Sequence, residues 1–368
     1  MSRPSMQKKP VKHLLSYLFL ICCVESIADP AETTVASGLK KTGNDGWVVD
    51  ERLLPLPAGA SAELQQAIAV SPRPLVKELG EEPPQSENEW LVMQRESSKA
   101  SLDEIAEAMN VSISRDKIAG VPVYRVNPKT PASKHDSKLF LHFHAGGYVL
   151  TGGDAAPAEA ALIAGAIGIE AISVDYRMSP LHPFPAALED AVAVYRQLLE
   201  NHSAESIVVG GSSAGGGLTL ATVLQLKALE LALPGAIWVG TPWADLSKTG
   251  DSLYTNDGID RVVMTYDGVM AAMARLYASG ENLKHPLISP VYGEYRGFPP
   301  TQLVTGTRDL FLSDTVRTHR KMRASGVDAD LNVYEGFSHA EYLMVPDSAE
   351  SREVLRELDR FIENFAAH

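Results

Sequence analysis

The chain has 368 residues, of which 45% are hydrophobic and 21% charged, and its formal net charge is −13 at pH 7. This composition is that of an ordinary globular protein and excludes a disordered chain, a collagen and a coiled coil. At this length we expect one large α/β domain with an added lid, or two smaller domains. An acidic body repels phosphate backbones and anionic lipid, so we expect no nucleic-acid partner.

Residues 1–28 differ from this acidic body, because they carry four Lys and Arg residues against one Glu. The basic start is followed by the apolar run 14–24 and then by Ser26-Ile27-Ala28, with small residues where a signal peptidase cleaves. The run is about half as long as the roughly 20 residues of a spanning helix. We therefore expect a signal peptide over 1–28 and a secreted or periplasmic protein without a stable membrane span. An uncleaved anchoring segment is the alternative.

The two cysteines, Cys22 and Cys23, both lie in this leader. A chain cleaved after Ala28 would contain no disulfide, no thiolate nucleophile and no cysteine metal site. A lipoprotein signal is disfavoured, because Leu20-Ile21 precede the cysteines where small residues are preferred.

Residues 29–110 form the expected N-terminal cap segment. Up to about residue 84 the chain is rich in Ala, Pro, Gly and acidic residues, and its one clearly periodic piece, 61–70, predicts a helix. This part has too few apolar residues to form a core alone, so it must pack on another part of the chain. Another helix is expected through 90–109.

Residues 111–368 are expected to form the catalytic domain, with a cap insertion at about 247–283. Two outer strands are predicted at 111–114 and 121–126. Further strands are predicted at 139–143, 171–175, 206–210, 235–240, 301–305 and 331–334, and helices at 158–165, 186–200, 214–229, 315–324 and 348–366. Strands that alternate with helices predict a mainly parallel central sheet flanked by helices, with an active site at the carboxyl ends of the strands.

Ser213 is the candidate nucleophile. It lies in Gly211-Ser-Ser-Ala-Gly215, between the strand predicted at 206–210 and a long helix. A Gly-x-Ser-x-Gly segment between strand and helix is typical of a nucleophile elbow, whose tight turn exposes the serine hydroxyl. The following helix places its positive dipole end beside any oxyanion formed there. The alternatives are a Gly/Ser-rich phosphate loop or a plain turn.

A candidate oxyanion hole follows the strand predicted at 139–143, in His144-Ala-Gly-Gly-Tyr148. The bare backbone amides of Gly146 and Gly147 can approach a substrate oxygen closely. Ester hydrolysis builds negative charge on the carbonyl oxygen, and fixed N–H donors stabilise it. With the amide of Ala214 they would make a three-donor hole. Alone, the motif could be a simple strand-to-loop turn.

The candidate base is His339, because it follows a predicted strand in Gly336-Phe-Ser-His-Ala340. In enzymes with a nucleophile elbow, the catalytic acid and then the catalytic histidine follow the serine along the chain. His319 lies in a charged helix, His368 is the last residue, and His285 leaves no room for a late strand-end acid before it.

The candidate acid is Asp309, at the end of the strand and loop 302–309. Its competitor is Asp314, which stands directly before the helix predicted at 315–324, where an N-cap explains it. Asp309 could also be a plain turn residue.

Taken together, these motifs resemble the bacterial branch of the hormone-sensitive-lipase family of α/β-hydrolase esterases, over about residues 138–365. The matching motifs are His144-Ala-Gly-Gly, Asp175-Tyr-Arg, His182-Pro-Phe-Pro-Ala-Ala-Leu-Glu-Asp190, Gly211-Ser-Ser-Ala-Gly215, Thr241-Pro-Trp-Ala-Asp245 and the loops at Asp309 and His339. The resemblance implies an α/β-hydrolase fold, a Ser213–Asp309–His339 triad, an oxyanion hole of Gly146, Gly147 and Ala214, and a helical cap.

Two positions depart from the family pattern, which usually has Gly at Ala145 and Asp or Thr at Ser212. They put the subfamily and the substrate preference in question. We interpret Asp175-Tyr176-Arg177, Glu189-Asp190 and His182 as contacts that support the fold.

The sequence therefore predicts a carboxylesterase that acts on short- to medium-chain acyl esters and needs no metal or organic cofactor. The alternatives are a lactone hydrolase, or a deacetylase or amidase with the same triad. A catalytically inactive protein that binds small molecules is less favoured, because both Ser213 and His339 are present. A lipase acting at oil surfaces is disfavoured by the acidic, Pro-rich lid region. The sequence leaves open whether two copies form a homodimer.

Overall fold

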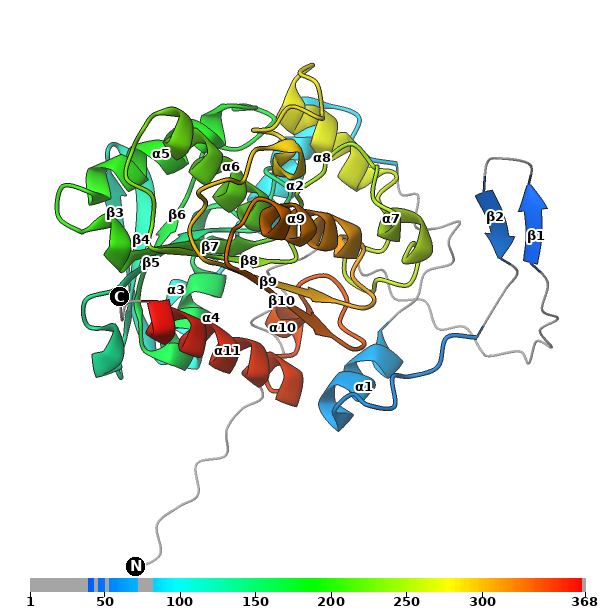
Figure 1. Ribbon diagram of the computed structural model, residues 1–368, viewed down its shortest axis with the longest axis horizontal. Helices are drawn as coiled ribbons and strands as arrows, with labels where there is room; N and C mark the ends of the chain where they lie inside the picture. Colours follow the sequence, from blue (N-terminus) through cyan, green and yellow to red (C-terminus); the bar gives the residue numbers. More distant parts are fainter. Residues whose placement is uncertain (1–38, 43–45, 50–52, 72–81, 366–368) are drawn as a thin grey trace, which may run out of the picture.

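The computed structural model describes residues 39–42, 46–49, 53–71 and 82–365 (Figure 1). The signal peptide predicted over 1–28 lies outside the described residues. Among the residues that are described, no helix combines the length and apolar character that crossing a membrane requires.

An eight-stranded sheet runs through the molecule (Figure 1). Its strands are β3 (Val111–Ile118), β4 (Val121–Pro128), β5 (Leu139–Phe143), β6 (Glu170–Val174), β7 (Ile207–Ser212), β8 (Ala236–Gly240), β9 (Thr301–Gly306) and β10 (Ala329–Tyr334). Their spatial order is β10-β9-β8-β7-β5-β6-β4-β3. The β3–β4 and β4–β6 pairs are antiparallel, and all other pairs are parallel. The inner strands lie where the sequence predicts them to within two residues, and the outer pair extends further.

Helices cover both faces of the sheet (Figure 1). On one face lie α5 (Ala186–Leu198), α6 (Ala214–Ala228) and α9 (Leu312–Ala324), and on the other lie α4 (Ala158–Ile167) and α11 (Ala349–Phe365). Successive strand residues point to opposite faces, so Leu139, Leu141 and Phe143 of β5 join the core under α5 and α6. Phe140 joins the core under α4 and α11. Because both faces are buried, the strands read as continuous apolar runs.

The helix predicted over 90–109 is two helices, so that prediction is wrong. They are α2 (Glu87–Ser97) and α3 (Leu102–Ala108). The chain leaves the first helix at Ser98, and the Ser101 side chain accepts the Glu104 N–H at 3.3 Å, which caps the second. Serine is among the preferred N-cap residues, and here it starts a new helix in the middle of a periodic stretch.

The N-terminal segment packs on the rest of the molecule. Helix α1 (Ala62–Val70) begins after Ser61, whose hydroxyl donates to Glu350 of α11 at 2.6 Å. Leu64 and Ile68 of α1 are buried in the core that contains α11. A separate antiparallel pair is formed by β1 (Leu39–Thr42) and β2 (Gly46–Val49).

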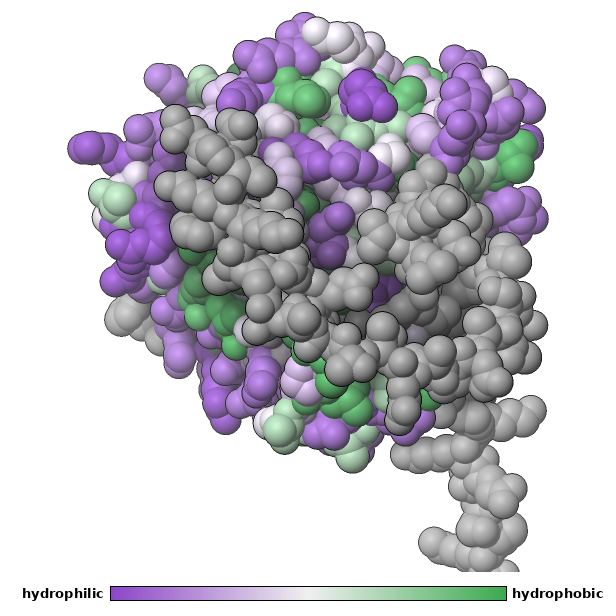
Figure 2. All heavy atoms as spheres, turned by 90° about the vertical axis from the view of Figure 1, so that its right-hand side faces the viewer, coloured by the Kyte–Doolittle hydropathy of each residue, from purple (hydrophilic) through white to green (hydrophobic). Residues whose placement is uncertain are grey.

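A long insertion joins β8 to β9 and contains α7 (Ser252–Thr255) and α8 (Val269–Ala278). Helix α10 (Glu341–Met344) follows β10. Single 3-10 turns lie at Ser133–His135, Gly153–Ala155, Ala204–Ser206 and Pro290–Tyr292. On the face shown in Figure 2, hydrophilic side chains predominate over the described surface, with smaller hydrophobic patches between them.

Candidate active site

Ser213 occupies the sharp turn between β7 and α6. Its φ of 58° and ψ of −122° are a backbone conformation that non-glycine residues rarely adopt. A Cβ at Gly211 or Gly215 would overlap the carbonyl oxygen of Phe143, so the two flanking glycines are required by the close approach of β5. This geometry is that of a nucleophile elbow.

Asp309 and His339 form a buried pair on the loops that follow β9 and β10. The Nδ1 of His339 lies 3.1 Å from Oδ1 of Asp309, and both side chains are fully buried. Thr305 donates its hydroxyl to Oδ2 of Asp309 at 2.7 Å, and the Phe311 N–H donates to Oδ1 at 2.8 Å. A neutral imidazole that donates Nδ1–H to a carboxylate carries its lone pair on Nε2, which is the form that a general base needs.

A chain of direct contacts joins the serine to the histidine. The Trp243 N–H donates to the Ser213 carbonyl oxygen at 2.9 Å. The Trp243 ring stacks on Phe311 with centroids 5.6 Å apart, and Phe311 meets the His339 ring edge-on at 4.8 Å. The ends of β7, β9 and β10 thus place the three predicted triad residues at one edge of the sheet.

The glycine loop predicted as an oxyanion hole follows β5 and is fixed from both sides. Gly146 and Gly147 have φ values of 103° and 63°, which favour glycine. Tyr176 donates its hydroxyl to the His144 carbonyl at 2.8 Å, and its ring stacks on the His144 ring with centroids 4.0 Å apart. Thr151 donates to the Ala145 carbonyl at 2.7 Å.

In the part of the chain that the structure describes, the backbone N–H groups of Gly146, Gly147 and Ala214 have no acceptor. They are therefore free to donate to a substrate oxygen. Burial lowers the pKa of His144 to about 3, so this histidine is neutral and acts through its contacts with the loop.

Beneath the elbow lies a buried polar network that sequence reasoning missed. Ser212 donates its hydroxyl to the carboxylate of Glu159, which is 1% exposed on α4. The Ser212 hydroxyl also lies 2.5 Å from that of Tyr342. The other oxygen of Glu159 lies 3.1 Å from Nε2 of His142 on β5. The serine at 212, at the end of β7 where the family usually has Asp or Thr, is thus the partner of a carboxylate on helix α4.

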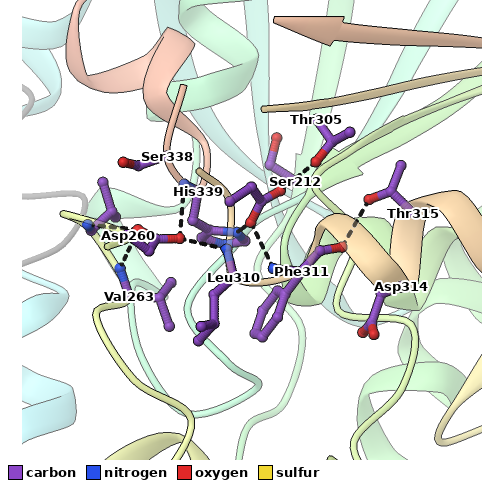
Figure 3. A network of polar contacts seen from close by, with 12 residues as sticks. Ser212, Asp260, Val263, Thr305, Leu310, Phe311, Asp314, Thr315, Ser338 and His339 are labelled. Carbon is purple, nitrogen blue, oxygen red and sulfur yellow. Dashed lines mark hydrogen bonds and ion pairs between the residues drawn. The ribbon is translucent and has the colours of Figure 1, made fainter. Parts of the chain in front are cut away.

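Asp260, in the insertion, is a second carboxylate beside His339 (Figure 3) and was also missed. Its Oδ2 accepts the backbone N–H of Leu310 at 2.8 Å and that of His339 at 3.1 Å. Nearby, Asn256 donates its side-chain amide to the Asp309 carbonyl oxygen at 2.8 Å. These contacts connect the insertion with the loops that carry Asp309 and His339.

The N-cap role predicted for Asp314 is wrong. Helix α9 begins at Leu312, and the carboxylate of Asp314 reaches away from the helix to accept the N–H groups of Ala244 and Asp245 at 3.1 and 2.9 Å. Burial, together with the charge of Asp245, raises the pKa of Asp314 well above its ordinary value.

The interpretation of Arg177, Glu189 and Asp190 as contacts that support the fold is confirmed. Arg177 pairs with Asp190 at 2.9 Å and with Glu189 at 3.0 Å on α5. Asp175 accepts the Gly153 N–H at 2.8 Å. These bonds fix the loop after β6 beside the glycine loop.

Comparisons with known proteins agree with this geometry. Residues 140–343 match the family described as alpha/beta hydrolase fold. The structure of an esterase named E25 is 46% identical, with a TM-score of 0.84 over 87% of this chain and 99% of that chain. An esterase from the bacterial hormone-sensitive lipase family is 29% identical, with a TM-score of 0.71 over 83% and 99% of the two chains.

An acetyl-hydrolase of Streptomyces hygroscopicus is 29% identical over 62% of this chain and 77% of its own length. The relatives thus agree in fold and in the kind of enzyme, which confirms the resemblance seen in the motifs. The chain belongs to the bacterial hormone-sensitive-lipase family of α/β-hydrolase esterases.

Proposed function

We propose that this ester hydrolase cleaves short- to medium-chain acyl esters through Ser213, His339 and Asp309. The observation that carries the proposal is the buried 3.1 Å contact between His339 Nδ1 and Asp309, on loops beside the elbow that holds Ser213. Such a pair keeps the imidazole in the tautomer that can take the serine proton.

In the proposed reaction, the Ser213 hydroxyl oxygen attacks the ester carbonyl carbon while Nε2 of His339 takes its proton. The amides of Gly146, Gly147 and Ala214 stabilise the oxyanion. The tetrahedral intermediate expels the alcohol, which receives the proton from His339. Water, activated by the same base, then cleaves the acyl-enzyme and regenerates the serine.

A deacetylase with the same triad is the second candidate function, because the Streptomyces relative is named an acetyl-hydrolase. Lactones and amides would use the same groups. The proposed cap consists of residues 29–110 together with the insertion at 247–283. Export through the predicted signal peptide over 1–28, and a homodimer, also remain proposals.

The test is Ser213→Ala together with a fluorophosphonate probe and a panel of p-nitrophenyl esters, lactones and acetylated sugars. We expect the wild type to be labelled and to prefer short to medium acyl chains. The variant should lose labelling and fall to the residual rate, about 10³ to 10⁴ over water, that oxyanion donors and binding supply alone. A variant that keeps most of its activity would contradict the assignment of the nucleophile.

A further inference from the structure

Asp260 binds both catalytic loops through one oxygen atom. Its Oδ2 accepts the N–H of Leu310, the residue after Asp309, and the N–H of His339 itself, at 2.8 and 3.1 Å (Figure 3). The two donors belong to loops that follow different strands, β9 and β10. Their relative position is therefore set in part by the carboxylate of Asp260, which comes from neither loop.

The second oxygen of Asp260 fixes the carboxylate to its own segment. Oδ1 accepts the N–H groups of Val262 and Val263 at 2.8 and 3.1 Å. The side chain thus accepts four backbone N–H groups and is only 1% exposed. Four N–H donors favour an ionised carboxylate, because it only accepts hydrogen bonds. They disfavour an amide or a carboxylic acid, because each of these carries hydrogens of its own that would point at a donor.

Charged groups face Asp260 from the elements that pack on it. Asp309 and His339 face it from the loops after β9 and β10. The neighbouring Arg261 is paired with Glu341 of α10 and also donates to Ser71. Burial, and then the charge of Asp309, raises the pKa of Asp260 to about 6.

We propose that Asp260 is a positioning residue of this active site, whose ionised carboxylate holds the loops of Asp309 and His339 in register. Its negative charge also favours the imidazolium that forms when His339 takes the serine proton. Because the pKa of Asp260 is raised, the carboxylate becomes neutral as the pH falls through about 6, and the hold on the loops weakens. The inference rests on the proposed triad and adds a residue from the insertion to its support.

The wild-type pH profile gives the first test. The reaction needs a neutral His339, and protonation of Asp260 lowers the rate further because it weakens the hold on the loops. We expect the acid limb of log kcat against pH to be steeper than a slope of one over the part of the range in which Asp260 gains its proton. A slope of one throughout would overturn the proposal, whether or not any variant folds.

Asp260→Asn gives the second test, with Asp257→Asn as the matched control, because Asp257 is exposed in the same segment. Rates are divided by the number of sites that a fluorophosphonate labels, so that misfolded protein does not count. We expect kcat per site to fall by about tenfold or more, with KM for p-nitrophenyl acetate nearly unchanged, because the geometry of proton transfer is disturbed. The acid limb should become a one-proton limb, and Asp257→Asn should match the wild type.

Asp260→Glu keeps the charge and should recover part of kcat together with the steeper acid limb. If Asp260→Asn only lowers the melting temperature or the number of labelled sites, the role is structural and the proposal is wrong. A wild type that the fluorophosphonate does not label contradicts the proposed function itself. A labelled wild type whose Asp260→Asn variant has the same kcat and pH profile contradicts only this inference.

Discussion

The hydroxyl groups of Ser212 and Tyr342 lie 2.5 Å apart, although 130 residues separate them in the chain. Ser212 directly precedes the proposed nucleophile, and Tyr342 lies three residues after the proposed base. A single hydrogen bond therefore connects the elbow with the histidine loop, and the carboxylate of Glu159 accepts from the same serine.

Removing either hydroxyl should weaken the fold at this point. We expect Ser212→Ala and Tyr342→Phe each to lower the free energy of unfolding by about 0.5 to 3 kcal/mol, because each removes a buried hydrogen bond and Ser212→Ala also takes the serine donor from Glu159. The double variant should lose less than the sum of the two, with a coupling energy of about 0.5 to 3 kcal/mol. Urea unfolding measures all three, with Tyr254→Phe as the control, since Tyr254 is 63% exposed. Strictly additive losses would show that the two hydroxyls do not interact.

Asp309→Asn should reduce kcat steeply, by about 10⁴ if it acts as in well-studied serine hydrolases, because His339 loses the acceptor that fixes its tautomer. Asp314→Asn should change kcat little. Burial raises the pKa of Asp314, which disfavours its charged form, and an Asn oxygen can accept the same two N–H groups. Steady-state kinetics and melting temperatures of the two variants check this ranking, and the reverse ranking would show that the acid is misassigned.

Activity should rise with pH through the acid range. Only the neutral imidazole of His339 can accept the serine proton, so the rate should fall as this ring gains a proton. His144 does not contribute to this limb, because its pKa of about 3 keeps it neutral throughout. The profile of kcat/KM against pH is the measurement. EDTA should leave the rate unchanged, and a rate lost on chelation and restored by zinc would contradict the triad.

Removing residues 29–84 should impair binding and selectivity. Within this stretch, the carbonyl oxygen of Pro55 accepts a guanidinium N–H of Arg308, the residue before Asp309, at 2.7 Å. Leu64 and Ile68 are buried in the core that contains α4 and α11. We expect a raised KM, a changed chain-length preference and exposed apolar surface that promotes aggregation. Ester-panel kinetics and light scattering check both effects. A soluble, monodisperse variant with unchanged kinetics over the panel would show that the segment is merely a tail.

The sheet could be predicted from the sequence because its inner strands are buried on both faces and read as short apolar runs between turn residues. The break between α2 and α3 was missed because helical periodicity continues across it. Yet Ser101 and Glu104 stand three residues apart, the spacing of a capping box, and Ser101 does cap α3. That local signal outweighs the periodicity.

The positions of Ser213, Asp309 and His339 were predictable because each follows a strand, and strand ends meet at one edge of a parallel sheet. Asp260 was not predictable, because its partners are backbone N–H groups, which every residue except proline carries. Asp314 was misinterpreted for a related reason. Asp314 accepts the N–H groups of Ala244 and Asp245, which lie about 70 positions earlier in the chain. No local sequence pattern predicts such a contact.

The insertion between β8 and β9 carries Asn256 and Asp260, both of which bind the loop of the proposed acid. In a chimera that takes this insertion from a relative, the relative's residues would stand in place of Asn256 and Asp260. The proposed triad would then lose the hydrogen bonds that these two residues make to the Asp309 loop. Grafts aimed at a new substrate preference should therefore retain residues 256–263 of the recipient. Turnover and selectivity can then be varied separately.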